Sequence, residues 1–163
     1  MRSLIFSIAT DGCEAETGAP PPDRVIAGTP QFRTWNVEEQ PGGLYAGVWE
    51  STPGKWRIQY DEWEYCRILS GVSVVTEDGG ETMRVGPGDS FVIRPGFKGT
   101  WEVVETTRKE YVIRLEFRVT SQSRPPRNSA AAARAASSPH QTPTAPSGVE
   151  RPSQDATGKP ITQ

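Results

Sequence analysis

The sequence is poor in the residues that usually build reactive or metal-binding centres. Among 163 residues it has one histidine, His140, and two cysteines, Cys13 and Cys66. Two cysteines are too few for the disulfide framework of a small secreted domain. We therefore expect two free thiols in a reducing compartment, and no site that needs several imidazoles.

Long hydrophobic runs are absent as well. The apolar stretch within residues 1–10 is interrupted by Ser7 and stopped by Asp11, and its length of about seven residues is at the lower limit for a secretory signal. No stretch approaches the ~20 apolar residues of a membrane-spanning helix. We expect a soluble, cytoplasmic protein with no membrane partner.

Aromatic residues are absent after Phe117. A segment without large apolar side chains cannot offset the entropy that it loses on ordering. The sequence therefore predicts three parts. Residues 1–22 form a flexible extension that ends in three prolines, residues 23–118 form the folded domain, and residues 119–163 form a disordered tail rich in Ser, Pro and Ala.

Charge is distributed unevenly between these parts. Residues 1–118 hold 13 basic and 18 acidic residues, a net charge of −5, whereas residues 119–163 carry a net charge of +3 from 5 basic and 2 acidic residues. A mildly acidic domain is a poor partner for nucleic acid. The positive charge of the tail is spread over 45 residues and forms no basic run.

The middle of the chain alternates between short strand patterns and turn signals, which is typical of an all-β fold. Residues 55–60 show the pattern best, because Trp56, Ile58 and Tyr60 share one face of the predicted strand. We find no stretch with apolar residues at helical spacing and proper caps. About nine strands suit a jelly-roll barrel, and they are predicted at residues 31–37, 44–50, 55–60, 63–69, 72–76, 82–85, 90–93, 99–104 and 109–117.

Two motifs point to a family. Glu64 is followed, after six residues, by Gly71, which resembles the end of the first cupin motif. The stretch Gly88–Gly96, with the sequence GDSFVIRPG, looks like the second cupin motif, and one hairpin separates the two. Glycines permit the tight turns, and Asp89 is suited to cap its turn. The resemblance implies a cupin-type double-stranded β-helix, or jelly-roll, barrel.

Flanking segments narrow the resemblance. The stretches at residues 47–56, 96–103 and 108–111 are similar to small cupins related to the ureidoglycine aminohydrolase domain. That resemblance implies a hydrolase acting on a ureido compound with a Mn-like divalent ion. It also implies pairing of the barrel into a homodimer.

The ligand set of a metal-binding cupin is largely missing. The family pattern places two histidines before the glutamate and one after the second motif's glycine. Here the glutamate position is Glu64, the last histidine position falls at Gly99, and His140 lies in the tail. The first two histidine positions fall at Ile58 and Tyr60 or, with a one-residue gap, at Arg57 and Gln59. Glu64 is thus the only matching ligand position, and we expect no metal cofactor.

Glu64 has two interpretations. It is either an interior carboxylate paired with Arg57 or Arg114, or a ligand-binding or catalytic acid–base group with a pKa raised by burial. Cys66 lies on the same strand face, where it is either a packed thiol or a nucleophile. The thiol interpretation fits better because no histidine is available as a base.

Four further residues have both a structural and a binding interpretation. Tyr60 and Trp101 are expected near the barrel mouth, either as core packing or as a stacking wall for a planar ligand. Lys98 and Arg94 flank the second-motif turn and form either a solvated surface or an anion-binding rim. The full set of pocket candidates is Arg57, Tyr60, Glu64, Cys66, Lys98 and Trp101.

Three functions follow from these observations. The first is a cupin that binds a small polar or planar molecule in the barrel without a standard histidine-based metal site. The second is a metal-dependent enzyme of the ureidoglycine aminohydrolase type. The third is a dimeric structural module whose tail makes the interactions. Jelly-roll barrels host many unrelated activities, so the fold alone does not choose among them.

Overall fold

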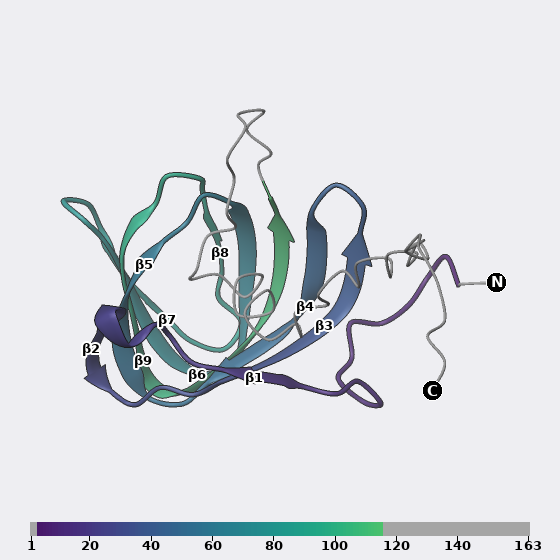
Figure 1. The fold of residues 1–163 in the computed structure, drawn as a ribbon, viewed down its shortest axis with the longest axis horizontal. Coiled ribbons are helices and arrows are strands. Elements are labelled where there is room, and N and C mark those ends of the chain that lie inside the picture. Colours follow the sequence, from purple (N-terminus) through teal and green to yellow (C-terminus); the bar gives the residue numbers. More distant parts are fainter. Residues whose placement is uncertain (1–2, 116–163) are drawn as a thin grey trace, which may run out of the picture.

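The computed structural model describes residues 3–115 of the chain. Within them nine strands form a curled sheet, so the predicted all-β barrel is confirmed. Figure 1 shows the sheet closing around a central interior. The predicted tail at residues 119–163 and the predicted domain end at residue 118 lie outside the described residues. The elements are β1 (Glu16–Gly18), a 3-10 turn η1 (Pro22–Arg24), β2 (Val25–Gly28), β3 (Phe32–Gln40), β4 (Leu44–Ser51), β5 (Gly54–Gln59), β6 (Trp63–Glu77), β7 (Thr82–Val85), β8 (Ser90–Ile93) and β9 (Lys98–Arg114).

Two long strands, β6 and β9, connect the whole barrel. They pair antiparallel with each other along most of their length. The other edge of β9 pairs with β4 and β5, and the other edge of β6 pairs with β7 and β8. The sequence predicts each of these strands as two shorter ones. A strand that bends through bulges can serve both sheets of a barrel without ending, and for this reason the predicted breaks are absent.

Gly71 lies at the bend of β6. Its φ is +81°, and a Cβ at this position would lie 2.1 Å from the Thr106 carbonyl oxygen of β9. The pairing of β6 with β9 shifts register several times between Ile68 and Ser73. Glycine permits both the left-handed backbone and the close approach of the neighbouring strand. The first motif's glycine thus bends a continuous strand and does not end one.

The other motif turns are formed as the sequence predicts. At the start of the second motif, Asp89 accepts a hydrogen bond from the Gly86 amide through Oδ2, at 2.8 Å. At its end, Gly96 has a φ of +93°. These two turns fix both ends of β8 and therefore the direction in which its side chains point.

The interior is dominated by aromatic side chains. Phe32 lies 5.2 Å from Trp49 and 5.1 Å from Trp56 between ring centroids, and Trp49 lies 5.7 Å from Trp101. The predicted alternation of residues 55–60 is confirmed, because Trp56, Ile58 and Tyr60 are all buried. Such tilted aromatic contacts add to the stabilisation from buried apolar area. The buried residues that form this core are Phe32, Trp49, Trp56, Ile58, Tyr60, Cys66, Val75, Ile93, Trp101, Val103, Tyr111 and Ile113.

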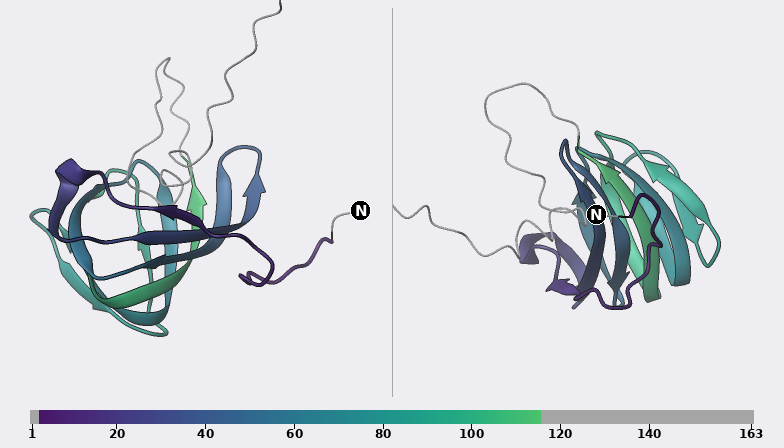
Figure 2. Two further views of the ribbon diagram at one scale, coloured as in Figure 1. Left: turned by 60° about the horizontal axis from the view of Figure 1, so that its bottom comes forward. Right: turned by 90° about the vertical axis from the view of Figure 1, so that its right-hand side faces the viewer.

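The N-terminal extension differs from the prediction, because part of it joins the barrel. Glu16–Gly18 form β1 and pair antiparallel with β3, which Figure 2 shows along the barrel's outer side. Further upstream, Thr10 Oγ1 accepts a hydrogen bond of 2.9 Å from Arg108. The free edge of β3 explains the difference, since an unpaired edge offers a row of backbone groups to any nearby extended segment.

Replacement of Gly71 by alanine tests the bend. We expect Gly71→Ala to lower the free energy of unfolding by more than about 2 kcal/mol, because it combines a positive φ with a backbone clash. Gly79 is the matched control, since its φ is +71° and a Cβ there would meet nothing within 4 Å. Gly79→Ala should cost about 1 kcal/mol. Equal losses in urea denaturation would contradict the proposed role of Gly71.

Candidate functional site

A buried ion pair lies inside the barrel. Lys109 on β9 donates a hydrogen bond from Nζ to Oε1 of Glu64 on β6, at 2.8 Å. The exposed fractions of the two side chains are 3% and 0%. Lys109 also contacts Cys66 Sγ at 3.3 Å. Charges removed from water must be paired to be tolerated, and this pair meets that requirement without help from solvent.

Two tryptophans enclose the lysine ammonium. Lys109 Nζ lies 4.4 Å from the ring centroid of Trp101 and 5.1 Å from that of Trp49. Both distances are within the range of cation–π attraction. We call the enclosure formed by Trp49, Glu64, Cys66 and Trp101 the ammonium box.

A chain of buried hydrogen bonds orients one wall of the box. Trp101 Nε1 donates to Ser73 Oγ at 3.1 Å, and Ser73 Oγ donates to Thr107 Oγ1 at 2.8 Å. Thr107 Oγ1 in turn donates to the Glu105 carbonyl at 2.8 Å. Each hydroxyl thus both accepts and donates, so the chain is fully satisfied. It holds the Trp101 ring against Lys109.

Electrostatics keeps the neighbouring groups protonated. Burial raises the pKa of Tyr60 well above its ordinary value, and the nearby Glu64, Cys66 and Glu62 side chains raise it further. Burial also raises the pKa of the Cys66 thiol, and the charge of Glu64 raises it further, while Lys109 opposes the shift without reversing it. Burial lowers the pKa of Lys109, but interactions with Cys66 and Glu64 outweigh it and the net pKa is raised. The box therefore holds a charged ammonium and a neutral thiol, and the phenol of the neighbouring Tyr60 is neutral.

The structure brings together four of the six predicted pocket residues. Tyr60, Glu64, Cys66 and Trp101 are all buried in the interior. The sequence interpretation of Glu64 as a paired carboxylate agrees with this geometry, but the expected partners Arg57 and Arg114 are wrong. Strand alternation turns both arginines outward, whereas Lys109 on β9 faces inward.

Arg57 and Lys98 do not belong to the interior. Arg57 donates to Asp78 Oδ1 at 2.8 Å on the outer surface, and the pKa of Asp78 is lowered mainly by its hydrogen bond with Arg57. Lys98 is exposed and pairs in register with Gln59 at the start of β9. Tyr60 and Trp101 are also deeper than the predicted barrel mouth, with exposed fractions of 3% and 1%.

Lys109 is the interior residue that sequence reasoning missed. Lysine is rarely buried, and a lysine at the start of a strand is ordinarily a solvated residue. A signal was nevertheless present, because Lys109, Tyr111 and Ile113 occupy alternate positions and thus one face of the strand. A lysine on the apolar face of a strand indicates a buried partner of opposite charge.

The donor set does not fit the divalent metal that the cupin resemblance implies. Ile58 and Tyr60 point inward but include no imidazole, and Arg57 and Gln59 are exposed. At Gly99, a Cβ would lie 1.9 Å from the Thr76 carbonyl oxygen. No group of three or more His, Cys, Asp or Glu side chains converges within residues 3–115. Because Glu64 Oε1 already accepts from Lys109, the interior offers no transition metal a usable ligand set.

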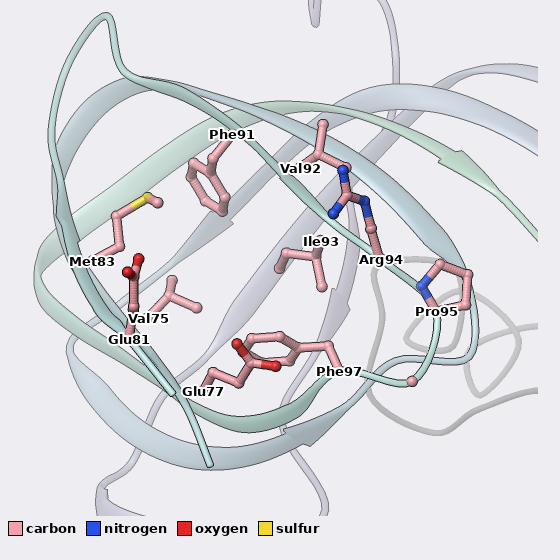
Figure 3. Close-up of a pocket in the computed structure, with 11 residues that line it drawn as sticks. Val75, Glu77, Glu81, Met83, Phe91, Val92, Ile93, Arg94, Pro95 and Phe97 are labelled. Carbon is pink, nitrogen blue, oxygen red and sulfur yellow. The ribbon is translucent and has the colours of Figure 1, made fainter. Parts of the chain in front are cut away.

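A cavity of about 380 Å³ lies beside the box, at the barrel mouth. Figure 3 shows Phe91, Ile93 and Phe97 around its centre, with Glu77, Glu81 and Met83 on one side and Arg94 on the other. The cavity is framed by the β6–β7 hairpin, strand β8 and the turn between β8 and β9. Its complete lining is Val75, Glu77, Glu81, Met83, Phe91, Val92, Ile93, Arg94, Pro95, Gly96 and Phe97.

The cavity and the ammonium box share a wall. Ile93 lines the cavity and is the register partner of Glu64, and Phe91 lines the cavity and is the register partner of Cys66. The Phe91 ring lies 6.0 Å from the Trp101 ring between centroids. None of the four box residues lines the cavity. Register partners carry their side chains on the same face of a sheet, so the cavity lies next to the box on the inner face of β6 and β8. A molecule in the cavity would contact Ile93 and Phe91, because the ion pair is not part of the lining.

Comparison with known proteins agrees with the barrel and its two motifs. Residues 38–111 match the family model of the EutQ-like cupin domain. No curated protein matches the sequence. The chain therefore contains a cupin-superfamily domain, as the motifs predict. The finer resemblance to ureidoglycine aminohydrolase stays a prediction.

Solved structures of two DUF861 proteins are similar to parts of this chain. A protein of unknown function of the DUF861 family from Pseudomonas syringae pv. tomato is 27% identical, with a TM-score of 0.56 over 61% of this chain and 43% of its own. This chain thus spans less than half the length of that protein. A DUF861 protein from Thermotoga maritima is 33% identical over 39% of this chain and 73% of its own, with a TM-score of 0.38.

A predicted oxalate decarboxylase from Thermotoga maritima is 14% identical, with a TM-score of 0.54 over 68% of this chain and all of its own. At this identity the likeness concerns the fold alone. Within the described part of the chain, no helix is long and apolar enough to cross a membrane.

A double-mutant cycle measures the coupling free energy between Glu64 and Lys109. We expect Glu64→Gln and Lys109→Met each to cost about 3–5 kcal/mol of unfolding free energy, because each leaves one buried charge alone. The double variant should cost clearly less than the two losses together. Lys55 and Glu102, an exposed pair at 3.2 Å, form the control cycle, with an expected coupling below about 1 kcal/mol. Additive losses at Glu64 and Lys109 would contradict the interaction.

The stability should also fall at alkaline pH. Above the ordinary thiol pKa of 9.0 the unfolded chain releases the Cys66 proton, whereas the folded chain keeps it because its pKa is raised. Folding stability then falls by up to about 1.4 kcal/mol per pH unit for this group. The raised pKa values of Tyr60 and Lys109 have the same sign and extend the loss above pH 10.

Thermal unfolding at pH 8 to 11 measures this slope. Cys66→Ala should reduce the slope between pH 9 and 10, and Cys13→Ala, which removes the partly exposed thiol, should not. An unchanged slope in Cys66→Ala would show that the Cys66 proton is not retained on folding.

Proposed function

We propose that this cupin domain binds a small molecule with a flat or apolar body in the cavity at the barrel mouth. The observation that carries the proposal is the cavity itself, whose volume of about 380 Å³ lies in the range of small-ligand pockets. The comparisons support a cupin domain, and the ligand is our own inference.

The floor of the cavity suits a flat ligand. Phe91 and Phe97 present aromatic rings, while Val75 and Ile93 are buried aliphatic residues. The Phe97 ring is held from behind by Tyr60, at 6.3 Å between centroids, and the Phe91 ring by Trp101. Rings fixed in this way give stacking area with little loss of side-chain entropy on binding.

The rim adds polarity of both signs. Glu77 and Glu81 belong to the β6–β7 hairpin, whereas Arg94 belongs to the opposite turn, and Figure 3 shows them on different sides of the cavity. Carboxylates favour amines and amidines, and a guanidinium favours carboxylates. We therefore propose a zwitterionic ligand, cationic at the glutamate side and anionic at the arginine side.

The proposal assigns no catalytic role to Glu64. That carboxylate is fully buried, is paired with Lys109 and is not part of the cavity lining. A general acid or base must reach the proton that it transfers, and Glu64 does not reach the cavity. The geometry therefore favours a binding module over the hydrolase alternative. A homodimer stays our prediction for the assembled protein, to be measured by light scattering.

Calorimetry with three planar probes tests the proposal. The probes are 4-amidinobenzoate, benzamidine and benzoate, and we expect the first to bind more tightly than the other two. Phe97→Ala should weaken all three at least fivefold, which corresponds to about 1 kcal/mol. Arg94→Gln should weaken the two carboxylates, and Glu77→Gln with Glu81→Gln should weaken the two amidines.

Arg67→Gln is the matched control, because Arg67 is exposed on β6 and does not line the cavity. Binding that Phe97→Ala leaves unchanged would place the probes elsewhere and contradict the proposal. Binding that depends on Phe97 but not on the rim charges would retain the cavity and reject the zwitterion.

A further inference from the structure

The ammonium box has the composition of a binding site for an organic cation. It supplies one carboxylate, one neutral thiol and two indole rings around the Lys109 ammonium, at 2.8, 3.3, 4.4 and 5.1 Å. Carboxylates bind ammonium ions by charge-assisted hydrogen bonds. Aromatic rings attract the same ions through their negative faces. Every group of the box therefore makes an interaction that an alkylammonium accepts.

The same groups are poor ligands for a divalent metal. A thiol binds a metal as the thiolate, and the Cys66 thiol is buried beside a carboxylate that favours its protonated form. The indole rings of Trp49 and Trp101 supply no metal ligand, since an indole N–H is a hydrogen-bond donor only. One carboxylate remains, which does not complete the four or more ligands of a typical site.

We infer that the box is the cation site of this barrel, and that its resident ligand is the primary ammonium of Lys109 in place of a metal ion. The inference goes beyond the proposed function and is independent of it, because it concerns the closed interior and not the cavity at the mouth.

The ammonium group stays in the box because it is covalently attached to the chain as part of Lys109. Lys109 lies on β9 between its register partners Trp49 on β4 and Ile68 on β6. Its side chain is therefore delivered to the box by the central strand of the barrel. A tethered group binds at an effective concentration that a free small molecule does not reach. The carboxylate also has a second oxygen, because Lys109 donates to Oε1 of Glu64 and not to Oε2.

Chemical rescue tests the inference in the full-length chain. Lys109→Ala removes three methylene groups and the ammonium, which together match propylammonium. We expect Lys109→Ala to lose thermal stability and to regain it with increasing propylammonium. Refolding of the variant with and without propylammonium is measured alongside, in case it does not fold alone. Wild type should gain nothing, since its box is filled.

Two controls separate charge from volume. Propan-1-ol has a similar size without the charge and should not rescue Lys109→Ala. The double variant Glu64→Gln, Lys109→Ala has no carboxylate and should not respond to propylammonium. Equal rescue by propan-1-ol, a response of the double variant, or no rescue of stability and refolding by propylammonium would each overturn the ammonium assignment.

Metal content gives an outcome that does not depend on any variant of Lys109. Untagged wild type, purified without chelator, is compared with Glu64→Gln by elemental mass spectrometry. We expect less than a tenth of an equivalent of Mn, Fe, Ni or Zn per chain in both. About one equivalent in wild type that is lost in Glu64→Gln would show that a metal occupies the site and would overturn the inference. A failure of probe binding at the mouth leaves both tests unaffected.

Discussion

A carboxylate without water must be neutralised where it lies, and the interior of this barrel depends on the way that Lys109 neutralises Glu64. Both side chains come from the two longest strands, β6 and β9, which pair with each other and between them also pair with β4, β5, β7 and β8. The ion pair thus sits where the scaffold is most constrained. The cost of burying two charges is offset by the short hydrogen bond, by the tryptophan faces and by the contact with Cys66. Neither charge is tolerated without the other.

The buried ion pair also determines which part of the barrel a ligand can enter. The lysine ammonium occupies the box, aromatic rings pack around it, and the hydrogen-bond chain of Trp101 is complete. The accessible space lies beside it, at the mouth, where Phe91 and Ile93 of β8 line the cavity. Phe91 and Ile93 serve both sides, since they line the cavity and pair with the strand that carries Cys66 and Glu64. The buried pair therefore supports the wall against which we propose that a ligand packs.

Much of the architecture was predictable because strands and turns depend on residues that are close together in the sequence. Alternation identified the inward face of Trp56, Ile58 and Tyr60, and the glycine and aspartate positions identified the turns at both ends of β8. Local signals failed where two strands meet. Gly71 reads as a strand end, but it bends a continuous strand because the Thr106 backbone of β9 approaches it closely. The pairing of Glu16–Gly18 with β3 was missed because these residues carry no strand pattern of their own.

By itself the sequence determined the all-β class, the cupin motifs, the core aromatic residues and the lack of histidine ligands within the domain. These features depend on composition and on spacing along the chain. Only the tertiary structure decided the partner of Glu64. The sequence offers Arg57, Arg114 and Lys109 as possible cationic partners. Alternation along β5 and β9 turns the two arginines outward and Lys109 inward. The cavity likewise joins the β6–β7 hairpin with the turn after β8, and no local pattern records that juxtaposition. Strand pairing sets the contacts between segments that are distant in sequence, and these contacts determine which side chains meet in the interior and around the cavity.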